Sequence, residues 1–104
     1  MTDSTDRLSA LIVRQRKFAS SKSPNETVQM KLSHLKEEIG EIADGLDIEE
    51  FADAMCLLID SLSLAGYSLS DLMDAMDRKL TINENSKWHF VEDLGYYKRI
   101  KPNA

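Results

Sequence analysis

Two pairs of acidic residues have the type and spacing of ligands for a divalent metal ion. Glu38 and Glu41 are followed, after an interval of eight residues, by Glu50 and Asp53. Residues three apart share a face of a helix, so each pair projects its carboxylates to one side. Carboxylate oxygens suit Mg²⁺ or Mn²⁺, whereas zinc prefers nitrogen and sulfur ligands, and the chain has two histidines and one cysteine. The spacing predicts a metal site made of these four carboxylates.

The distribution of charge supports the same interpretation. Residues 37–77 contain twelve Asp or Glu and no Lys or Arg, whereas residues 1–36 contain seven basic and three acidic residues, and residues 78–104 contain six and three. So many carboxylates repel one another unless cations, protons or wide spacing relieve the repulsion. The alternative is that they form solvated helix faces, and Glu50 could also serve as a capping residue. The net charge of −5 argues against a general nucleic-acid-binding function.

Length and composition predict one soluble domain over residues 1–104. Hydrophobic residues make up 42% of the chain and charged residues 30%, as in ordinary globular proteins. No apolar run approaches the ~20 residues required to cross a bilayer, so we expect no membrane contact and a cytoplasmic location. Cys56 is the only cysteine, and its apolar neighbours indicate a buried structural thiol.

Four helices must position the carboxylates, and nothing in the sequence is typical of a strand. The first helix covers residues 5–19. The second follows the start signal Ser23-Pro24-Asn25-Glu26 and ends at Gly45, where we expect a left-handed conformation. Asp47 caps the third helix, with Glu50 as its capping-box partner, and Gly66 ends it.

The rest of the chain completes a bundle. The fourth helix begins at Ser68 or Ser70 and includes Leu80, and the segment from Trp88 onward is expected to be a loop, with residues 91–104 as a C-terminal tail. The third helix is apolar almost all round, so other helices must cover most of its surface. The sequence therefore predicts an all-α four-helix bundle that assembles as a homo-oligomer.

The second and third helices are joined by a short turn, which predicts antiparallel neighbours with both carboxylate pairs at one end. His34 lies on the same stripe as Glu38, one turn earlier. Lys79, Asn83 and Lys87 follow at four-residue spacing and share a face if the fourth helix continues that far. Such a stripe can bind phosphate oxygens, although a solvated helix end has the same composition.

Several stretches, taken together, resemble a known family. Besides the acidic pairs, these are His34-Leu35-Lys36-Glu37-Glu38-Ile39, Ala65-Gly66-Tyr67-Ser68, and the run from Lys79 through Asn83 to Lys87-Trp88. Over about residues 28–90 the chain is similar to the MazG-like all-α nucleotide pyrophosphohydrolases. Within them it resembles the dATP/dGTP diphosphohydrolase branch, which is often phage-encoded and includes MazZ-type enzymes.

The resemblance implies a fold and an activity. The fold is a MazG-like bundle that forms a homodimer or homotetramer, in the host cytoplasm if the protein is phage-encoded. The activity is hydrolysis of a purine deoxynucleoside triphosphate to the monophosphate and pyrophosphate, with metal-bound water attacking the α-phosphorus. The resemblance assigns two or three Mg²⁺ or Mn²⁺ ions to Glu38, Glu41, Glu50 and Asp53, one of which also helps to remove the proton. Substrate binding is assigned to His34, Lys79, Asn83, Lys87 and Trp88.

The base and the class of function leave alternatives. Ser21 and Asn25 offer donors and acceptors that suit a guanine edge, which favours dGTP or GTP over dATP. A dUTP or damaged-nucleotide pyrophosphohydrolase on the same fold is the alternative enzyme. A non-catalytic acidic helical module, whose apolar helix binds a protein partner, is the alternative outside enzymes.

Overall fold

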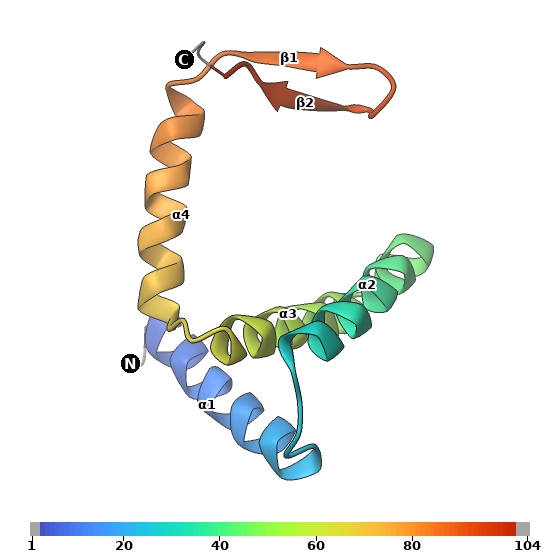
Figure 1. Cartoon of the computed structure of the whole chain (residues 1–104), viewed down its shortest axis with the longest axis vertical. Coiled ribbons are helices and arrows are strands. Elements are labelled where there is room, and N and C mark those ends of the chain that lie inside the picture. Colours follow the sequence, from blue (N-terminus) through green and yellow to red (C-terminus); the bar gives the residue numbers. More distant parts are fainter. Residues whose placement is uncertain (1–2, 102–104) are drawn as a thin grey trace. The chain divides into compact units, whose positions relative to one another are not determined.

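The computed structural model describes residues 3–101, apart from the side chain of Thr5. The chain divides between Ser68 and Leu69 into two compact units, the first with three helices and the second with one helix and a two-stranded sheet. The elements, shown in Figure 1, are α1 (Ser4–Lys22), α2 (Val28–Gly45), α3 (Ile48–Leu64), α4 (Leu69–Glu84), β1 (Trp88–Val91) and β2 (Tyr96–Arg99). The prediction of four helices is confirmed.

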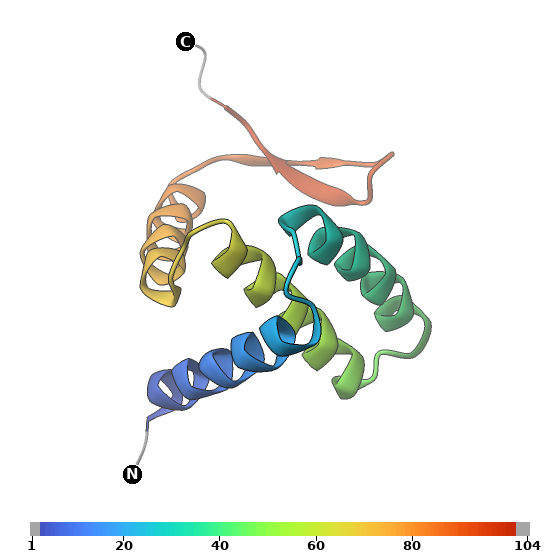
Figure 2. The ribbon, with the colours of Figure 1, turned by 60° about the horizontal axis from the view of Figure 1, so that its bottom comes forward.

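In unit 1, α2 and α3 form an antiparallel hairpin, and α1 packs against α3 (Figure 2). Only Leu46 and Asp47 separate α2 from α3. Leu46 is left-handed, with φ 55°, and its N–H donates to the Ile42 carbonyl at 2.7 Å. The prediction that Gly45 takes this conformation is wrong, because the helix continues through Gly45 before it ends. Asp47 is the N-cap of α3, as predicted, but its side chain makes no capping hydrogen bond.

The start of α2 differs from the prediction. Thr27 is the N-cap, and its Oγ1 accepts a hydrogen bond from the Met30 N–H at 3.2 Å. Ser23, the expected cap, instead ends α1 and donates its N–H to a carbonyl of the last turn of that helix. Glu26, the expected capping-box partner, lies before the helix because its carboxylate pairs with two cations.

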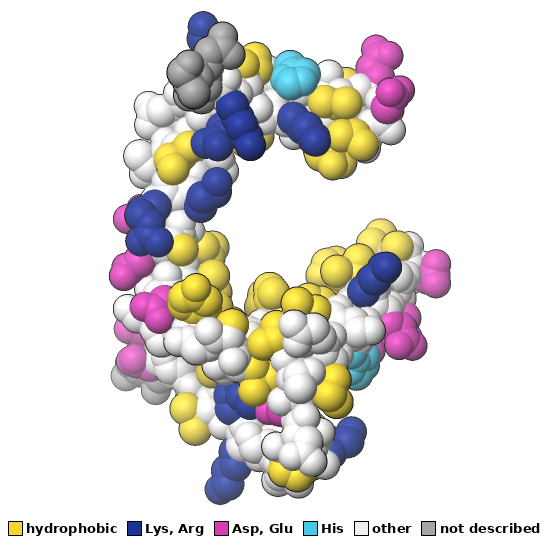
Figure 3. All heavy atoms as spheres, viewed as in Figure 1, with side chains coloured by type: hydrophobic (Ala, Val, Ile, Leu, Met, Phe, Trp, Pro, Cys, Tyr) yellow, Lys and Arg dark blue, Asp and Glu magenta, His cyan; other side chains and the backbone are white. Residues whose placement is uncertain are grey.

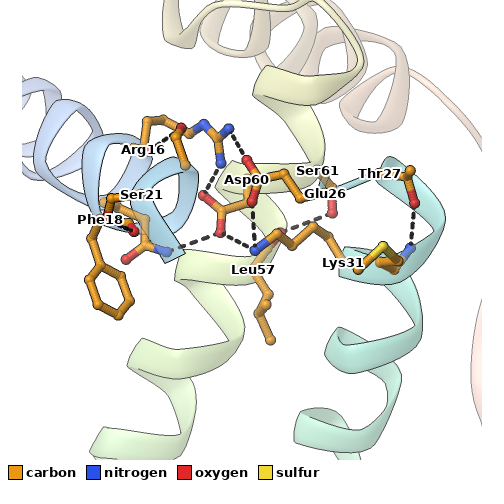
Figure 4. A network of polar contacts seen from close by, with 12 residues as sticks. Arg16, Phe18, Ser21, Glu26, Thr27, Lys31, Leu57, Asp60 and Ser61 are labelled. Carbon is orange, nitrogen blue, oxygen red and sulfur yellow. Dashed lines mark hydrogen bonds and ion pairs between the residues drawn. The ribbon is translucent and has the colours of Figure 1, made fainter. Parts of the chain in front are cut away.

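A buried ion network joins the three helices of unit 1 (Figure 4). Asp60 of α3 is 0% exposed and accepts hydrogen bonds from Arg16 Nη1 at 2.8 Å and Gln15 Nε2 at 3.0 Å, both from α1. Lys31 Nζ of α2 lies 3.3 Å from Asp60 Oδ2 and 3.0 Å from Glu26 Oε2. Arg16 also pairs with Glu26. Because two cations face two carboxylates, the charges cancel, and losing one member would leave another uncompensated in the interior.

The apolar interior of unit 1 is small. Among the described residues, the buried hydrophobic side chains are Ala19, Leu57 and Ile59. On α3, Met55 and Leu58 remain 54% and 47% exposed. Within the described part of the chain no single helix is long and apolar enough to span a membrane, although α3 and α4 meet that test jointly as a bent pair. With so little apolar burial, the ion network is a main link between the helices of unit 1.

In unit 2, α4 ends three residues before Lys87. Lys79 and Asn83 lie on the helix, but α4 does not continue as far as Lys87, so the condition for Lys87 to share their helical face is not met. The chain turns away here, because the Asn83 carbonyl accepts the indole N–H of Trp88 at 2.9 Å. The Lys87 carbonyl in turn accepts the N–H of Ile100 at 2.8 Å.

The segment from Trp88 onward is a β-hairpin, which corrects the prediction of a loop. β1 pairs antiparallel with β2, with Trp88 opposite Arg99. Phe90 and Tyr97 pack edge to face, with ring centroids 5.3 Å apart. Gly95 closes the turn with φ 75°, a conformation that favours glycine. Aromatic residues on both sides of an Asp-x-Gly turn are a hairpin signal that the sequence interpretation missed.

The prediction for the C-terminal end changes accordingly. The expected tail, residues 91–104, contains the turn and β2, and its residues 102–104 lie outside the described part of the chain. The predicted all-α class is therefore corrected to four helices with one short hairpin. Strands of four residues are easily overlooked in a sequence, because alternation is short and the neighbouring helix has a stronger pattern.

The ion network generates a prediction for stability. In an Asp60→Asn variant, two cations would share a single carboxylate, that of Glu26. We expect D60N to lower the free energy of unfolding by about 3–5 kcal/mol, the usual effect of breaking a buried ion pair. Chemical denaturation measures the change. Asp44→Asn, on the exposed end of α2, is the matched control and should change stability by less than about 0.5 kcal/mol. Equal effects of the two substitutions would contradict the role of Asp60.

Candidate metal centre

Carboxylates of α2 and α3 converge at the end of the hairpin where the two helices are joined. Glu38, Glu50 and Asp53 each offer a ligand oxygen, and these oxygens all lie within 4.8 Å of one another. Glu41 lies beside them, because its carboxyl contributes to the raised pKa of both Glu38 and Glu50. The structure thus brings together three of the four carboxylates that the sequence spacing selected, and the role of Glu41 as a fourth ligand remains a prediction. Glu50 belongs to this cluster rather than to the predicted capping box.

The carboxylates perturb one another strongly. A hydrogen bond with Glu41, together with the loss of surrounding water, raises the pKa of Glu50 to about 7. Burial, followed by contact with Glu41, also raises the pKa of Glu38. One oxygen of each, Glu38 Oε2 and Glu50 Oε2, is buried and has no hydrogen-bond partner among the described residues. Protons relieve this repulsion when no cation is bound, and divalent cations would relieve it more completely.

His34 touches the cluster from the predicted stripe of α2. Its Nε2 lies 3.2 Å from Glu38 Oε1, and the imidazole is 56% exposed. A contact of this kind can fix the orientation of a metal-binding carboxylate. The predicted substrate-binding role of His34 remains a prediction.

The donor set fits hard divalent ions. All four groups offer oxygen, which suits Mg²⁺ or Mn²⁺. Cys56 lies nearby on α3, but burial, followed by repulsion from Asp60, raises the pKa of its thiol. The thiol therefore stays protonated and does not serve as a thiolate ligand. Cys56 is half-buried rather than buried as predicted, and its structural role remains a prediction.

A cavity of about 410 Å³ adjoins the cluster within unit 1. Glu38 and Asp53 line one part of it, and Lys31 and Asp60 of the ion network line another. Phe18 of α1 also lines the cavity. This volume is in the usual range for small-molecule sites, which is about 300–1,000 Å³. The chemistry of the cavity therefore joins a metal-binding end to a polar, charge-neutral end.

Sequence reasoning missed the residues of the ion network. Ser21 and Asn25, predicted to contact a base, do not line this cavity, and the Ser21 hydroxyl donates to the Phe18 carbonyl at 2.7 Å. Lys31 and Asp60 line it instead. The available signal was Asp60 itself, a lone carboxylate within the apolar third helix, because a buried charge requires partners.

The other predicted substrate-binding residues lie in unit 2. Lys79 and Asn83 are on α4, Lys87 lies between α4 and β1, and Trp88 begins β1. Figure 3 shows basic side chains gathered where α4 gives way to the hairpin. Within unit 2 the Trp88 indole N–H donates to the Asn83 carbonyl, and the contact of all four residues with substrate remains a prediction.

Comparisons with known proteins agree on one family. Residues 14–104 match the family described as dATP/dGTP pyrophosphohydrolase. A "dATP/dGTP diphosphohydrolase" of Salmonella phage PMBT28 is 37% identical over 78 residues, which cover 73% of this chain and 26% of that protein. The chain thus spans about a quarter of the length of this relative.

A solved structure shares the fold. It is the cyanophage S-2L MazG-like pyrophosphohydrolase, bound to dGDP and three catalytic Mn²⁺ ions per active site. The TM-score is 0.76 at 28% identity, and the match covers 88% of this chain and 95% of that one. The predicted resemblance is confirmed by all three comparisons. The chain belongs to the dATP/dGTP pyrophosphohydrolase family.

Proposed function

We propose that this protein hydrolyses a purine deoxynucleoside triphosphate, dGTP in preference to dATP, to the monophosphate and pyrophosphate. One observation supports this above all: the carboxylates of α2 and α3 meet beside a cavity of about 410 Å³. A cluster of oxygen ligands at one end of a cavity is suited to a substrate that carries phosphates at one end and a base at the other. The relatives named above favour the same chemistry.

The four carboxylates, Glu38, Glu41, Glu50 and Asp53, would hold two or three Mn²⁺ or Mg²⁺ ions. Such ions would neutralise the charge on the phosphate oxygens and would lower the pKa of a bound water for attack. The buried oxygens of Glu38 and Glu50 that have no hydrogen-bond partner are suited to ligation. Glu50 can also accept a proton near neutral pH, because its pKa is raised to about 7.

The other residues assigned to substrate binding would orient the substrate. His34 holds Glu38 through its Nε2 and limits the orientations of that carboxylate. Lys79, Asn83 and Lys87 can contact phosphate oxygens by charge and amide donation, and Trp88 can cover a base. Phosphoryl chemistry depends mainly on such positioning and on neutralising charge.

We further infer that the protein works as a homodimer or homotetramer. Large apolar side chains are exposed along α3, including Phe51 at 47% and Met55 at 54%. Figure 3 shows apolar side chains gathered along the arm of unit 1 that α2 and α3 form. Extensive exposed apolar surface on a folded chain marks an interface, and a second copy would supply matching apolar surface.

The first prediction concerns activity. We expect pyrophosphate release from dGTP with Mn²⁺ or Mg²⁺, in an assay of each of the common NTPs and dNTPs. Glu38→Gln and Asp53→Asn should each abolish turnover almost completely, by at least about 100-fold, because metal ligands act as a unit. Circular dichroism should show that both variants retain their helices.

Glu49→Gln is the matched control, since Glu49 is an exposed neighbour of Glu50 outside the cluster. It should keep the activity of the parent. No release from any nucleotide with either metal would refute the enzyme, and undiminished activity in both E38Q and D53N would refute the metal site. Preferred release from dUTP would overturn the purine assignment.

The second prediction concerns pH. The pKa of Glu50 is about 7 in the folded protein and 4.5 as its ordinary value, so the folded state retains a proton that the unfolded chain has lost. This contribution to stability is fully present below pH 4.5 and is lost as pH rises through about 7. We therefore expect the Tm of the metal-free protein to fall between about pH 5 and about pH 8.

Added Mn²⁺ should reverse this trend, because ligation requires the deprotonated carboxylates and its affinity rises with pH. Differential scanning calorimetry with and without metal measures both effects. The pKa of Glu26 is lowered, so its contribution is lost only as pH falls below 4.5, outside this range. Glu50→Gln should flatten the metal-free slope, and an unchanged slope in E50Q would contradict the assignment.

The third prediction concerns assembly. Sedimentation should give a mass of two or four times the 11.8 kDa of one chain. Leu58→Glu places a charge on the exposed apolar side of α3 and should shift the protein towards smaller species. Gln29→Glu adds the same charge at an exposed polar position of α2 and should leave the mass unchanged. A single-chain mass for the parent would refute the homo-oligomer.

A further inference from the structure

The cavity beside the metal centre has two chemically different ends. Lys31 and Glu38 line it from α2, seven residues apart, and Asp60 and Asp53 line it from α3 at the same separation. Seven residues are two helical turns, a rise of about 10 Å. Because α2 and α3 are antiparallel, Glu38 and Asp53 share one end, and Lys31 and Asp60 share the other. This span matches a nucleoside monophosphate, whose phosphate and base lie at opposite ends.

The charges of the two ends decide the orientation of the substrate. The metal centre attracts phosphate once its carboxylates hold divalent ions. The other end gives phosphate no net attraction, because Arg16 and Lys31 are balanced by Glu26 and Asp60. A neutral end with fixed donors and acceptors suits a base instead. Phe18, which is 58% exposed and lines the cavity, offers an aromatic face for stacking.

Two carboxylates hold Lys31, whose ammonium has one more N–H donor than it has ion-pair partners among the described residues. An ammonium has three N–H donors. Among the described residues, Lys31 Nζ has two ion-pair partners, Glu26 Oε2 at 3.0 Å and Asp60 Oδ2 at 3.3 Å, and Lys31 also lines the cavity. Burial alone would lower the pKa of Lys31, but its bonds to these two carboxylates raise it, so the group stays charged. Arg16 fixes both carboxylates in turn, through Asp60 Oδ1 at 2.8 Å and through Glu26.

We propose that Lys31 is a specificity-determining residue, which donates its remaining N–H to the 6-oxo group of a purine and thereby favours dGTP over dATP. This inference rests on the proposed function and names the residue that selects its base. Guanine presents O6 and N7 as acceptors, whereas adenine presents an amine donor at position 6. Adenine would set that amine against an ammonium that has only donors. Glu26 and Asp60 are positioning residues, because they hold the ammonium in place.

Four nucleotides test the chemistry at position 6 separately from that at position 2. dGTP and dITP carry a 6-oxo group, whereas dATP and the 2,6-diaminopurine deoxynucleotide carry a 6-amino group. We expect kcat/KM for the first two to exceed the others by roughly 10- to 100-fold, the effect of a hydrogen bond from a charged donor. Lys31→Met should bring the ratio of kcat/KM for dGTP or dITP to kcat/KM for dATP close to one.

The controls separate recognition from stability. Lys31→Met combined with Glu26→Gln keeps the network neutral, since Arg16 still balances Asp60. Lys36→Met removes an exposed lysine of α2 and should keep the parent's preference. Loss of folded protein lowers the rate for every nucleotide equally. Only a recognition role therefore changes the ratio of kcat/KM for dGTP to kcat/KM for dATP. Calorimetry of dGMP and dAMP binding measures the ratio of the two affinities without turnover.

Each outcome decides the proposal. A parent that treats 6-oxo and 6-amino purines alike, or a K31M/E26Q variant that keeps the preference for dGTP, would overturn the role of Lys31 while pyrophosphate release still supports the proposed function. If no nucleotide releases pyrophosphate, the proposed function fails. The ratio of dGMP to dAMP binding, in the parent and in the double variant, then decides the role of Lys31 by itself.

Discussion

Asp60 is a carboxylate with no exposed surface, on a helix that otherwise presents apolar residues, and the arrangement of unit 1 depends on how its charge is balanced. Arg16 reaches it from α1 and Lys31 from α2, so three helices meet at one buried charge. The apolar interior contributes little beside it, since the buried hydrophobic residues described are only Ala19, Leu57 and Ile59. A buried ion network depends on direction and distance, unlike apolar contact, and it therefore sets where α1 and α2 lie against α3.

Unit 1 contains two groups of carboxylates whose negative charge is balanced in different ways. At one end, the chain supplies cations of its own to Asp60 and Glu26. At the other end, Glu38, Glu50 and Asp53 meet without a Lys or Arg, because residues 37–77 contain none. The first arrangement is complete and stabilises the fold. The second is complete only with protons or added cations, as the raised pKa of Glu50, about 7, indicates. The ion network and the candidate metal centre are thus separated by about two helical turns within one hairpin.

Exposed apolar surface links the fold of one chain to its assembly. α3 was expected to be covered on most sides, and within its own unit it is covered only in part, as Met55 and Leu58 show. A single chain of this size can bury only part of its apolar surface. The proposed homo-oligomer would complete the burial. The candidate metal centre and the cavity beside it lie within unit 1.

Local sequence patterns were sufficient to predict the four helices, the antiparallel pairing of α2 with α3 and the convergence of Glu38, Glu50 and Asp53, because three-residue spacing and a short turn act locally. The role of Asp60 depends instead on tertiary structure, since its partners Arg16 and Lys31 lie far from it along the chain. The structure also places the start of α2 after Glu26. The Glu26 carboxylate pairs with Arg16 and Lys31 and does not serve in the predicted capping box. Local signals fix which elements form, whereas the compensation of a buried charge depends on residues that only folding brings together.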